Sequence, residues 1–295
     1  MRVAVTGASG LIGSALVPAL RARGDDVLRL VRRTAAAPDE VAWDPSRGWV
    51  DAARLDGVDA VVHLAGAGVG DKRWTDSYKA EIRDSRVEGT RTIATTIANM
   101  SNKPSVLVSG SAIGYYGDTG DHEVTEKSPQ GAGFLADVVA DWEAAARPAQ
   151  DADIRTCFAR TGLVVSDKGG AWKRLLPIFK LGLGGKIGSG RQYWSFISLR
   201  DEVAALTALI DNTAYAGPVN LTAPHPVTNA EVTAAMGRVL GRPTLLPVPS
   251  FALKVALGEF SEDVLGSQRV LPDVLRDHGF GWQDATIDEA IRATV

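Results

Sequence analysis

Three glycines stand three residues apart near the start of the chain, in the run Thr6-Gly7-Ala8-Ser9-Gly10-Leu11-Ile12-Gly13. Apolar residues precede the run at positions 2–5 and recur after it at helical spacing, so a strand passes into a helix through this turn. Gly7 permits a tight turn, Gly10 lets backbone approach a pyrophosphate, and Gly13 lets helix and strand pack closely. A tight turn alone also favours glycine, but the position between strand and helix predicts a dinucleotide whose phosphates bind at the helix start.

Two arginines, Arg32 and Arg33, follow the second expected strand at residues 27–31. A site specific for NAD has an acidic residue here, which hydrogen-bonds the ribose hydroxyls. Guanidinium groups suit a 2'-phosphate better, because they carry the opposite charge and donate paired hydrogen bonds. The pair therefore predicts NADP, with NAD the less favoured cofactor; the alternative is two solvated arginines at a strand end.

Apolar strands and longer helical stretches alternate through the first half of the chain. We expect strands at residues 2–5, 27–31, 59–66, 105–109 and 154–159, and helices at residues 74–99 and 134–146. This alternation predicts an α/β fold with a doubly wound parallel sheet of the Rossmann type. The ligand of such a sheet lies across the carboxyl ends of its strands, just after Val5, Val31, Leu64, Val108 and Ala159.

The second half is richer in glycine and proline, which predicts a smaller C-terminal substrate lobe. We expect a dinucleotide-binding domain at residues 1–163, with later returns of the chain to the sheet left open, and the lobe at residues 164–295. Residues 182–190 suggest a hairpin and residues 242–249 a linker.

Composition excludes several classes of protein. The 295 residues are 45% hydrophobic with a net charge of -3, which suits an enzyme with a sizeable core and gives no reason to expect nucleic acid. The first strand begins at once and no apolar run reaches membrane-spanning length, so we expect a cytoplasmic protein with no membrane partner. The lone Cys157 is predicted to be a buried thiol of the core. His63 lies inside an apolar strand and is predicted to be a hydrogen-bonded core histidine. The sequence has neither paired histidines nor a cysteine cluster, so it gives no indication of a metal site.

Several motifs together resemble the extended short-chain dehydrogenases/reductases, and more narrowly their atypical epimerase-like branch with an extra C-terminal domain of unassigned function. The resemblance covers nearly the whole chain, and its marks are Thr6 to Gly13, Leu64-Ala65-Gly66-Ala67, Arg73-Trp74, Ser85-Arg86-Val87, Ser111 to Gly117, Arg160-Thr161-Gly162, Trp194 to Asp201, Pro249-Ser250-Phe251 and Leu271 to Phe280. It implies a nicotinamide nucleotide, sugar-nucleotide-like chemistry, and an extra domain at about residues 247–295.

One feature of that group is missing. Relatives use a tyrosine as general acid/base and a lysine four residues later, whereas none of the five tyrosines here has a lysine at that spacing. Counting back from Trp142-Glu143, we place Leu135 and Val139 where the tyrosine and lysine would stand. Arg86 similarly stands where many relatives have asparagine.

Polar residues after the fourth expected strand are the remaining candidates for proton transfer. We predict Ser111 as a hydrogen-bond donor to a substrate oxygen and Tyr116 as a replacement acid/base, with Arg86 and Arg160 as sources of a field that lowers the phenol pKa. The alternative is that Tyr115 and Tyr116 pack against the cofactor or the core. The predicted cofactor-binding residues are Gly7, Ser9, Gly10, Leu11, Ile12, Gly13, Arg32, Arg33, Leu64, Ala65, Gly66, Ser109 and Arg160.

Two functions of different classes follow. The first is an NADP-dependent oxidoreductase or epimerase acting on a sugar-nucleotide-like or small carbonyl or alcohol substrate, as a monomer or homodimer. The second is a non-catalytic NADP(H)-binding sensor or regulatory partner protein. We favour the enzyme, because residues 111–117 carry more polar and aromatic groups than nucleotide binding requires. Trp74 and Trp194 are the tryptophans that we expect in a substrate pocket.

Overall fold

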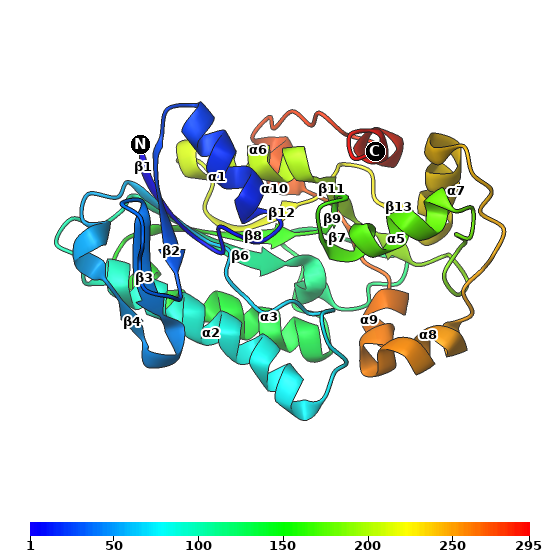
Figure 1. Cartoon of the computed structure of the whole chain (residues 1–295), viewed down its shortest axis with the longest axis horizontal. Helices are drawn as coiled ribbons and strands as arrows, with labels where there is room; N and C mark the ends of the chain where they lie inside the picture. The colour runs from blue at the N-terminus through cyan, green and yellow to red at the C-terminus, as the bar shows by residue number, and fades with distance from the viewer.

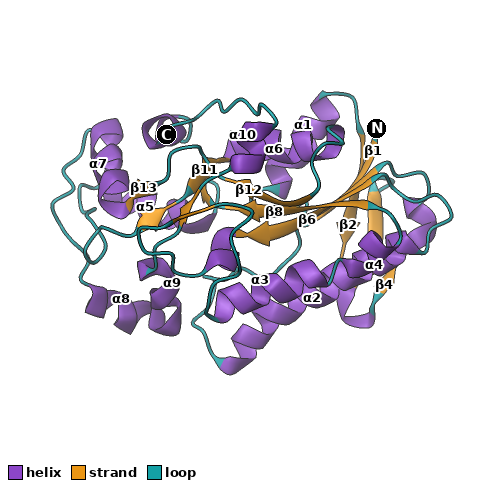
Figure 2. Cartoon of the chain, turned by 180° about the vertical axis from the view of Figure 1, so that it is seen from behind, coloured by secondary structure: helices purple, strands orange, loops and turns teal.

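An eight-stranded sheet with helices on both faces forms the centre of the computed structural model, which describes residues 1–295 (Figure 1, Figure 2). Its strands in spatial order are β12 (Gly217–Leu221), β8 (Arg155–Thr161), β6 (Val106–Ala112), β5 (Ala60–His63), β1 (Arg2–Thr6), β2 (Asp26–Val31), β3 (Glu40–Asp44) and β4 (Trp49–Val50). All neighbours pair in parallel except β3 and β4, which pair antiparallel. The order reverses between β1 and β5, so the doubly wound sheet is confirmed.

Alternate residues of the central strands point into two different cores. In β1, Val3 and Val5 pack into one core, while Ala4 packs into the other. In β6, Val108 packs into the same core as Val3 and Val5, and Leu107 packs into the same core as Ala4. Since both faces are covered, these strands read as continuous apolar runs rather than as alternating ones.

Two helical layers enclose the sheet. The helices α1 (Gly13–Ala22), α6 (Leu199–Asp211) and α10 (Asp273–Asp277) cover one face, as both views show (Figure 1, Figure 2). The helices α2 (Asp76–Ala98), α3 (Phe134–Ala144) and α4 (Arg147–Asp151) cover the other face. Thr75 caps α2 by accepting a hydrogen bond from the Tyr78 backbone N–H.

The C-terminal lobe has a third core, in which Trp172 is fully buried. Its elements are α5 (Gly170–Lys180), α7 (Asn229–Leu240), α11 (Ile287–Arg292), the parallel pair β9 (Leu163–Val165) and β11 (Phe196–Ser198), and the antiparallel pair β10 (Tyr193–Trp194) and β13 (Val227–Thr228). Next to them lie α8 (Ser250–Leu257), α9 (Ser261–Leu265) and the parallel pair β7 (Glu123–Val124) and β14 (Arg269–Val270). Short 3-10 helices complete the chain at η1 (Pro45–Arg47), η2 (Ala52–Leu55), η3 (Ile113–Tyr116) and η4 (Gly258–Phe260).

The structure differs from the sequence-based expectation at residues 182–190. These residues form no hairpin: Ile187 makes a single bridge to Val248, and a turn follows. The chain returns to the central sheet after residue 163, which the sequence left open: α6 covers one face and β12 adds the eighth strand. None of the helices is both long and apolar enough to cross a bilayer.

Candidate functional site

The turn between β1 and α1 requires its glycines. Gly7 has φ +65°, and a Cβ atom there would lie 2.7 Å from the carbonyl carbon of Leu64. A Cβ atom on Gly13 would lie 2.2 Å from the Gly7 carbonyl oxygen. Around Gly10 the only atom within 4 Å of such a Cβ is the Gly7 oxygen at 3.2 Å, so this side of the turn is open to a ligand.

Unpaired backbone donors lie at the start of α1. The N–H groups of Leu11, Ile12 and Gly13 donate to no oxygen of the protein, and no side chain caps the helix. Ser9 and Gly10 are exposed beside them. A diphosphate fits here, because it would supply acceptors to these donors at the positive end of the helix dipole.

The carboxyl end of β5 is held beside this turn by Thr6. Its hydroxyl oxygen accepts hydrogen bonds from the backbone N–H groups of Leu64 and Ala65 at 3.0 and 3.2 Å, and Gly66 beyond them is exposed. The same hydroxyl lies 2.8 Å from Nδ1 of His63. Burial lowers the pKa of His63 to about 4, so this histidine is a neutral core residue, as the sequence predicts.

The two arginines after β2 have different surroundings. Arg33 donates to both carboxylate oxygens of Glu40, at 2.6 and 2.8 Å, and Glu40 is 3% exposed. Arg32 is exposed and forms no ion pair. Of the two predicted partners of a 2'-phosphate, Arg32 is therefore the cation available to a ligand.

A buried ion pair connects the ends of β6 and β8 to α3. Glu143 accepts hydrogen bonds from Arg160 Nε and Nη2, both at 2.8 Å, and from Ser111 Oγ at 2.6 Å. Arg160 is 3% exposed, and its guanidinium carbon lies 3.5 Å from the centre of the Tyr115 ring. Burial alone would lower the pKa of Arg160. The hydrogen bonds and the charge of Glu143 outweigh burial, so the pKa of Arg160 lies above its usual value.

Tyr116 belongs to the same cluster. Its hydroxyl donates to Asn220 Oδ1 at 2.8 Å and accepts from Arg160 Nη1 at 3.0 Å. Burial raises the pKa of Tyr116 to about 12, against the opposing effect of Arg160. This environment favours the alternative that Tyr116 packs in the core, where it contacts Ile113 and Val270.

The positions aligned with the missing tyrosine and lysine face this cluster. Leu135 and Val139 of α3 lie 3.5 and 3.9 Å from the site of a Cβ on Gly114, and Glu143 stands one turn further along the same helix. The sequence alone assigns no chemistry to Glu143. Glu143 lies four residues after Val139, and this spacing could have indicated that it shares one face of α3 with Leu135 and Val139.

Two further predicted residues take backbone partners. Ser109 is fully buried and donates to the Gly110 carbonyl oxygen at 3.2 Å. Arg86 donates from Nη1 to the carbonyl oxygens of Ala67 and Ile82, at 2.9 and 3.0 Å, and lies over the Trp142 ring. Burial lowers the pKa of Arg86 to about 10.

A cavity of about 260 Å³ lies near the end of β6 and the start of α3; Ser111, Glu143 and Arg160 are not among the residues that line it. The 3-10 helix η3 contributes Gly114, α3 contributes Leu135, and the loop before α2 contributes Trp74. The C-terminal segment supplies the facing residues Glu259, Glu262, Asp263, Gly266 and Gln268. Trp194 is not among the residues that line this cavity; it packs against the core of the C-terminal lobe.

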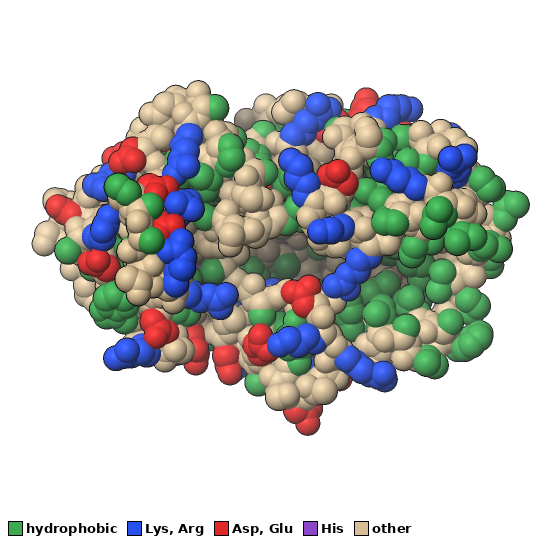
Figure 3. All heavy atoms as spheres, viewed as in Figure 1, with side chains coloured by type: hydrophobic (Ala, Val, Ile, Leu, Met, Phe, Trp, Pro, Cys, Tyr) green, Lys and Arg blue, Asp and Glu red, His purple; other side chains and the backbone are tan.

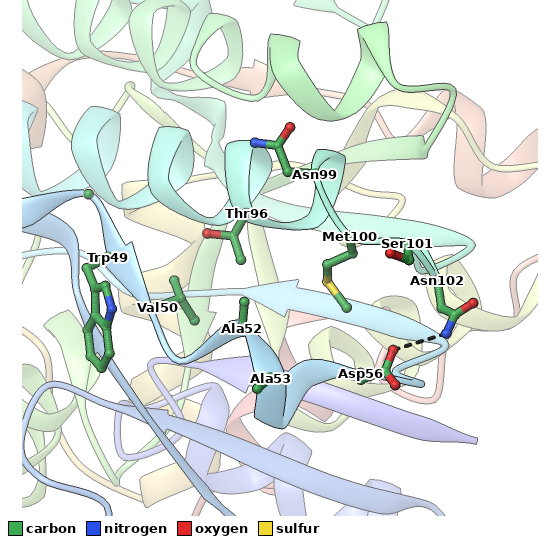
Figure 4. Close-up of a pocket in the computed structure, with 11 residues that line it drawn as sticks. Trp49, Val50, Ala52, Ala53, Asp56, Thr96, Asn99, Met100, Ser101 and Asn102 are labelled. Carbon is green, nitrogen blue, oxygen red and sulfur yellow. Dashed lines mark hydrogen bonds between the residues drawn. The ribbon is translucent and has the colours of Figure 1, made fainter.

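A wider depression of about 660 Å³ lies away from this cluster (Figure 4). Trp49, Thr96, Asn99 and Met100 are among the residues that line it, and Asn102 Nδ2 donates to Asp56 at 3.1 Å. Because Asp56 also accepts a hydrogen bond from Arg2 at the first residue of β1, the depression lies at the amino end of the sheet. The turn that fits a diphosphate is at the opposite, carboxyl end.

Together the fold and the glycine turn define a dinucleotide-binding protein of the short-chain dehydrogenase/reductase class. The family model described as "NAD dependent epimerase/dehydratase family" matches residues 3–221, and a domain of unknown function, DUF1731, matches residues 248–294. The chain belongs to this epimerase/dehydratase family, and the recognition made from its motifs is confirmed.

Similar proteins cover the whole chain. Epimerase family protein Mb2239 of Mycobacterium bovis is 48% identical, over 98% of this chain and 96% of the relative. The crystal structure of human epimerase family protein SDR39U1 with NADPH superposes with a TM-score of 0.92 at 32% identity, and covers 99% of this chain and 98% of that one. A structure of MoeE5 with UDP-glucuronic acid and NAD (TM-score 0.78, 20% identity, 100% of this chain and 97% of that one) shares the fold.

Proposed function

We propose that this protein is an NADPH-dependent oxidoreductase or epimerase for a small alcohol or carbonyl substrate, sugar-nucleotide-like ones included. The observation that carries the proposal is the hydrogen-bonded Ser111–Glu143–Arg160 cluster at the carboxyl ends of β6 and β8. We infer from the count back from Trp142-Glu143 that Leu135 and Val139 occupy the positions of the usual tyrosine and lysine, and Glu143 lies one turn beyond Val139 on α3. The cluster offers a different route for the proton.

In the direction of oxidation, the substrate hydroxyl gives its proton to Ser111 Oγ, and the Ser111 proton passes along its 2.6 Å hydrogen bond to Glu143. A nicotinamide nucleotide held at the glycine turn would supply the hydride acceptor for the carbinol carbon. Arg160 holds the Glu143 carboxylate in place through two N–H donors. The reverse sequence returns both protons when a carbonyl is reduced.

The choice of NADPH is supported by Arg32 and by the NADPH in the crystal structure of the human relative. Leu11, Ile12 and Gly13 would hold the diphosphate through backbone N–H groups, and Arg32 the 2'-phosphate. Gly66 and its neighbours after β5 would lie along the dinucleotide.

The second candidate is an NADPH-binding sensor without turnover. The observation that favours it is the confinement of Tyr116, whose hydroxyl is tied to Asn220 and Arg160 and whose pKa is about 12. A phenol with this raised pKa stays protonated near neutral pH and is therefore a poor general base.

Turnover and cofactor affinity of matched variants separate the two candidates. In a panel of alcohols, carbonyls and sugar nucleotides, Ser111→Ala and Glu143→Gln should lower kcat by about 100-fold or more, because each breaks the proton route. NADPH affinity, measured by calorimetry, should stay within about 3-fold of the unmodified protein. Ser101→Ala, in an exposed loop at the other end of the sheet, is the control. Tight NADPH binding without turnover of any panel member would leave the sensor as the function.

A further inference from the structure

Most of the exposed large apolar side chains gather in one region. Of eleven such residues, eight belong to residues 178–183 and 245–255. They form what we call the apolar face: Ile178, Leu181, Leu183, Leu245, Leu246, Val248, Phe251 and Val255. Figure 3 shows hydrophobic side chains gathered on the side where α5, α7 and α8 lie in Figure 1.

Backbone hydrogen bonds join the two segments of the apolar face. Val248 N–H donates to the Lys186 carbonyl oxygen, and Gly188 N–H donates to the Val248 carbonyl oxygen, each at 2.9 Å. Leu246 N–H donates to the Gly184 carbonyl oxygen at 3.4 Å. The face is therefore one continuous surface.

The helix α8 is the clearest sign that this surface lacks its partner. Six of its eight residues are Phe, Leu, Val or Ala, yet none is buried. Phe251 and Val255, one turn apart, are 72% and 73% exposed. A helix with this composition is normally covered by other apolar groups.

The two segments that carry the apolar face contain cations and no acidic residue, whereas Glu259, Glu262 and Asp263 follow directly after α8. Residues 168–200 and 232–258 contain ten lysines and arginines and no aspartate or glutamate, although the whole chain has a net charge of -3. Arg174, Arg200 and Arg238 pair with aspartates elsewhere in the chain. The other seven form no ion pair: Lys168, Lys173, Lys180, Lys186, Arg191, Arg242 and Lys254.

We propose that the apolar face docks on an anionic lipid surface. Exposed leucine, valine and phenylalanine side chains enter the boundary between headgroups and acyl chains, and unpaired lysines and arginines bind the anionic headgroups. A second copy of this chain fits less well, because a symmetric contact would place the same seven cations against themselves. The proposal concerns attachment to one leaflet, which needs no spanning helix, and it revises our expectation of no membrane partner.

Vesicle flotation tests this proposal with the full chain. We expect binding to phosphatidylcholine vesicles that contain phosphatidylglycerol to exceed binding to phosphatidylcholine alone by about tenfold, and to fall at high salt. Leu245→Ser with Phe251→Ser, and separately Lys180→Gln with Lys186→Gln, should each lower the bound fraction several-fold. Trp49→Ser, which changes a side chain that is 50% exposed at the far edge of the sheet, is the apolar control.

Unchanged NADPH affinity and near-ultraviolet circular dichroism would show that each variant is folded. Absence of vesicle binding, or binding that neither pair of substitutions weakens, overturns the proposal. A dimer that Leu245→Ser with Phe251→Ser converts to monomer, without vesicle binding by the unmodified protein, would make the face a subunit interface and also overturn it.

Discussion

Glu143 shows how a single side chain can connect packing with chemistry. Its carboxylate accepts one hydrogen bond from Ser111 and two from Arg160, so it joins α3 to β6 and β8. Removing its charge would leave Arg160 buried without a counter-charge, which is costly. Glutamine at this position keeps the shape of the side chain but also removes the charge, so a loss of turnover by that variant reports on the proton route where unchanged NADPH affinity and near-ultraviolet circular dichroism show that it is folded.

Arg32 carries the prediction on cofactor choice. Arg32→Ala should weaken NADPH binding by about 10- to 100-fold, because a charge-assisted contact with the 2'-phosphate is lost, and should leave NADH binding unchanged. Arg33→Ala should weaken it less, since Glu40 holds that guanidinium. Calorimetric titration of both nucleotides measures the effect. Equal affinities for NADPH and NADH in the unmodified protein would contradict the assignment.

Tyr116 carries a prediction on stability rather than rate. Tyr116→Phe removes a buried hydroxyl that bonds Asn220 and Arg160, and should lower the free energy of unfolding by about 1–3 kcal/mol. The pH profile of turnover should not change, because a phenol with a pKa of about 12 stays protonated near neutrality. If the rise or the fall of turnover with pH disappeared in Tyr116→Phe, Tyr116 would belong to the proton route.

Among the elements, central strands and long helices could be predicted from sequence, and edge strands could not. The helix expected at residues 134–146 is observed at Phe134–Ala144, and the strand expected at residues 105–109 at Val106–Ala112. In contrast, β12 begins with Gly217-Pro218, a pair typical of turns, and only its register with β8 makes it a strand. The two segments of the apolar face are likewise distant in sequence and meet only in the fold.

In the candidate site too, residues set by local sequence could be predicted, and contacts between distant segments could not. The glycine turn is local, so its residues could be identified from spacing alone. The Glu143–Arg160 pair joins residues on different elements, and nothing in either local sequence indicates the partner. Leu135 and Val139 could be located because a helix repeats every three to four residues.

Helix α6 contains a carboxyl group that should make stability depend on pH. Glu202 is fully buried; its one partner is Thr161, and its second carboxylate oxygen has none. Burial raises the pKa of Glu202 to about 8, against the hydrogen bond from Thr161. Between the unfolded pKa and this value the folded state binds more protons than the unfolded state, so stability falls as pH rises.

Glu202→Gln should remove that dependence. The free energy of unfolding of the variant should exceed that of the unmodified protein by about 1 kcal/mol or more at pH 8.5, and the gap should shrink at pH 5. Urea denaturation at the two pH values measures both quantities. A gap of the same size at both would show that ionisation of Glu202 is not its cause.

The whole molecule is expected to unfold as one unit, because the C-terminal segment completes its cores. Ile291 of α11 is fully buried in the core of the C-terminal lobe, and Leu275 of α10 in the core of the central sheet. Strand β14 pairs with β7, and Asn220 Nδ2 of β12 donates to the Leu271 carbonyl oxygen at 2.9 Å. The DUF1731 segment is thus held to the family domain by several independent contacts.

Ile291→Ala should lower the free energy of unfolding by about 2–5 kcal/mol, since it leaves a cavity in a buried core. Tryptophan fluorescence should still report one transition in urea, shifted to lower concentration. Val295→Ala, in the same segment at a residue 52% exposed, should change stability by less than about 0.5 kcal/mol. Two separate transitions in the Ile291 variant would show that the C-terminal segment unfolds independently.

The position of β12 has a consequence for synthesis on the ribosome. Strand β8 ends at Thr161, but the strand that covers its outer side ends only at Leu221, sixty residues later. At about 5–20 residues per second, the nascent chain carries β8 as an open sheet edge for about 3–12 s. Two emerging chains can join through such an edge. The speed of translation across these sixty codons therefore sets the time during which newly made molecules are vulnerable to aggregation.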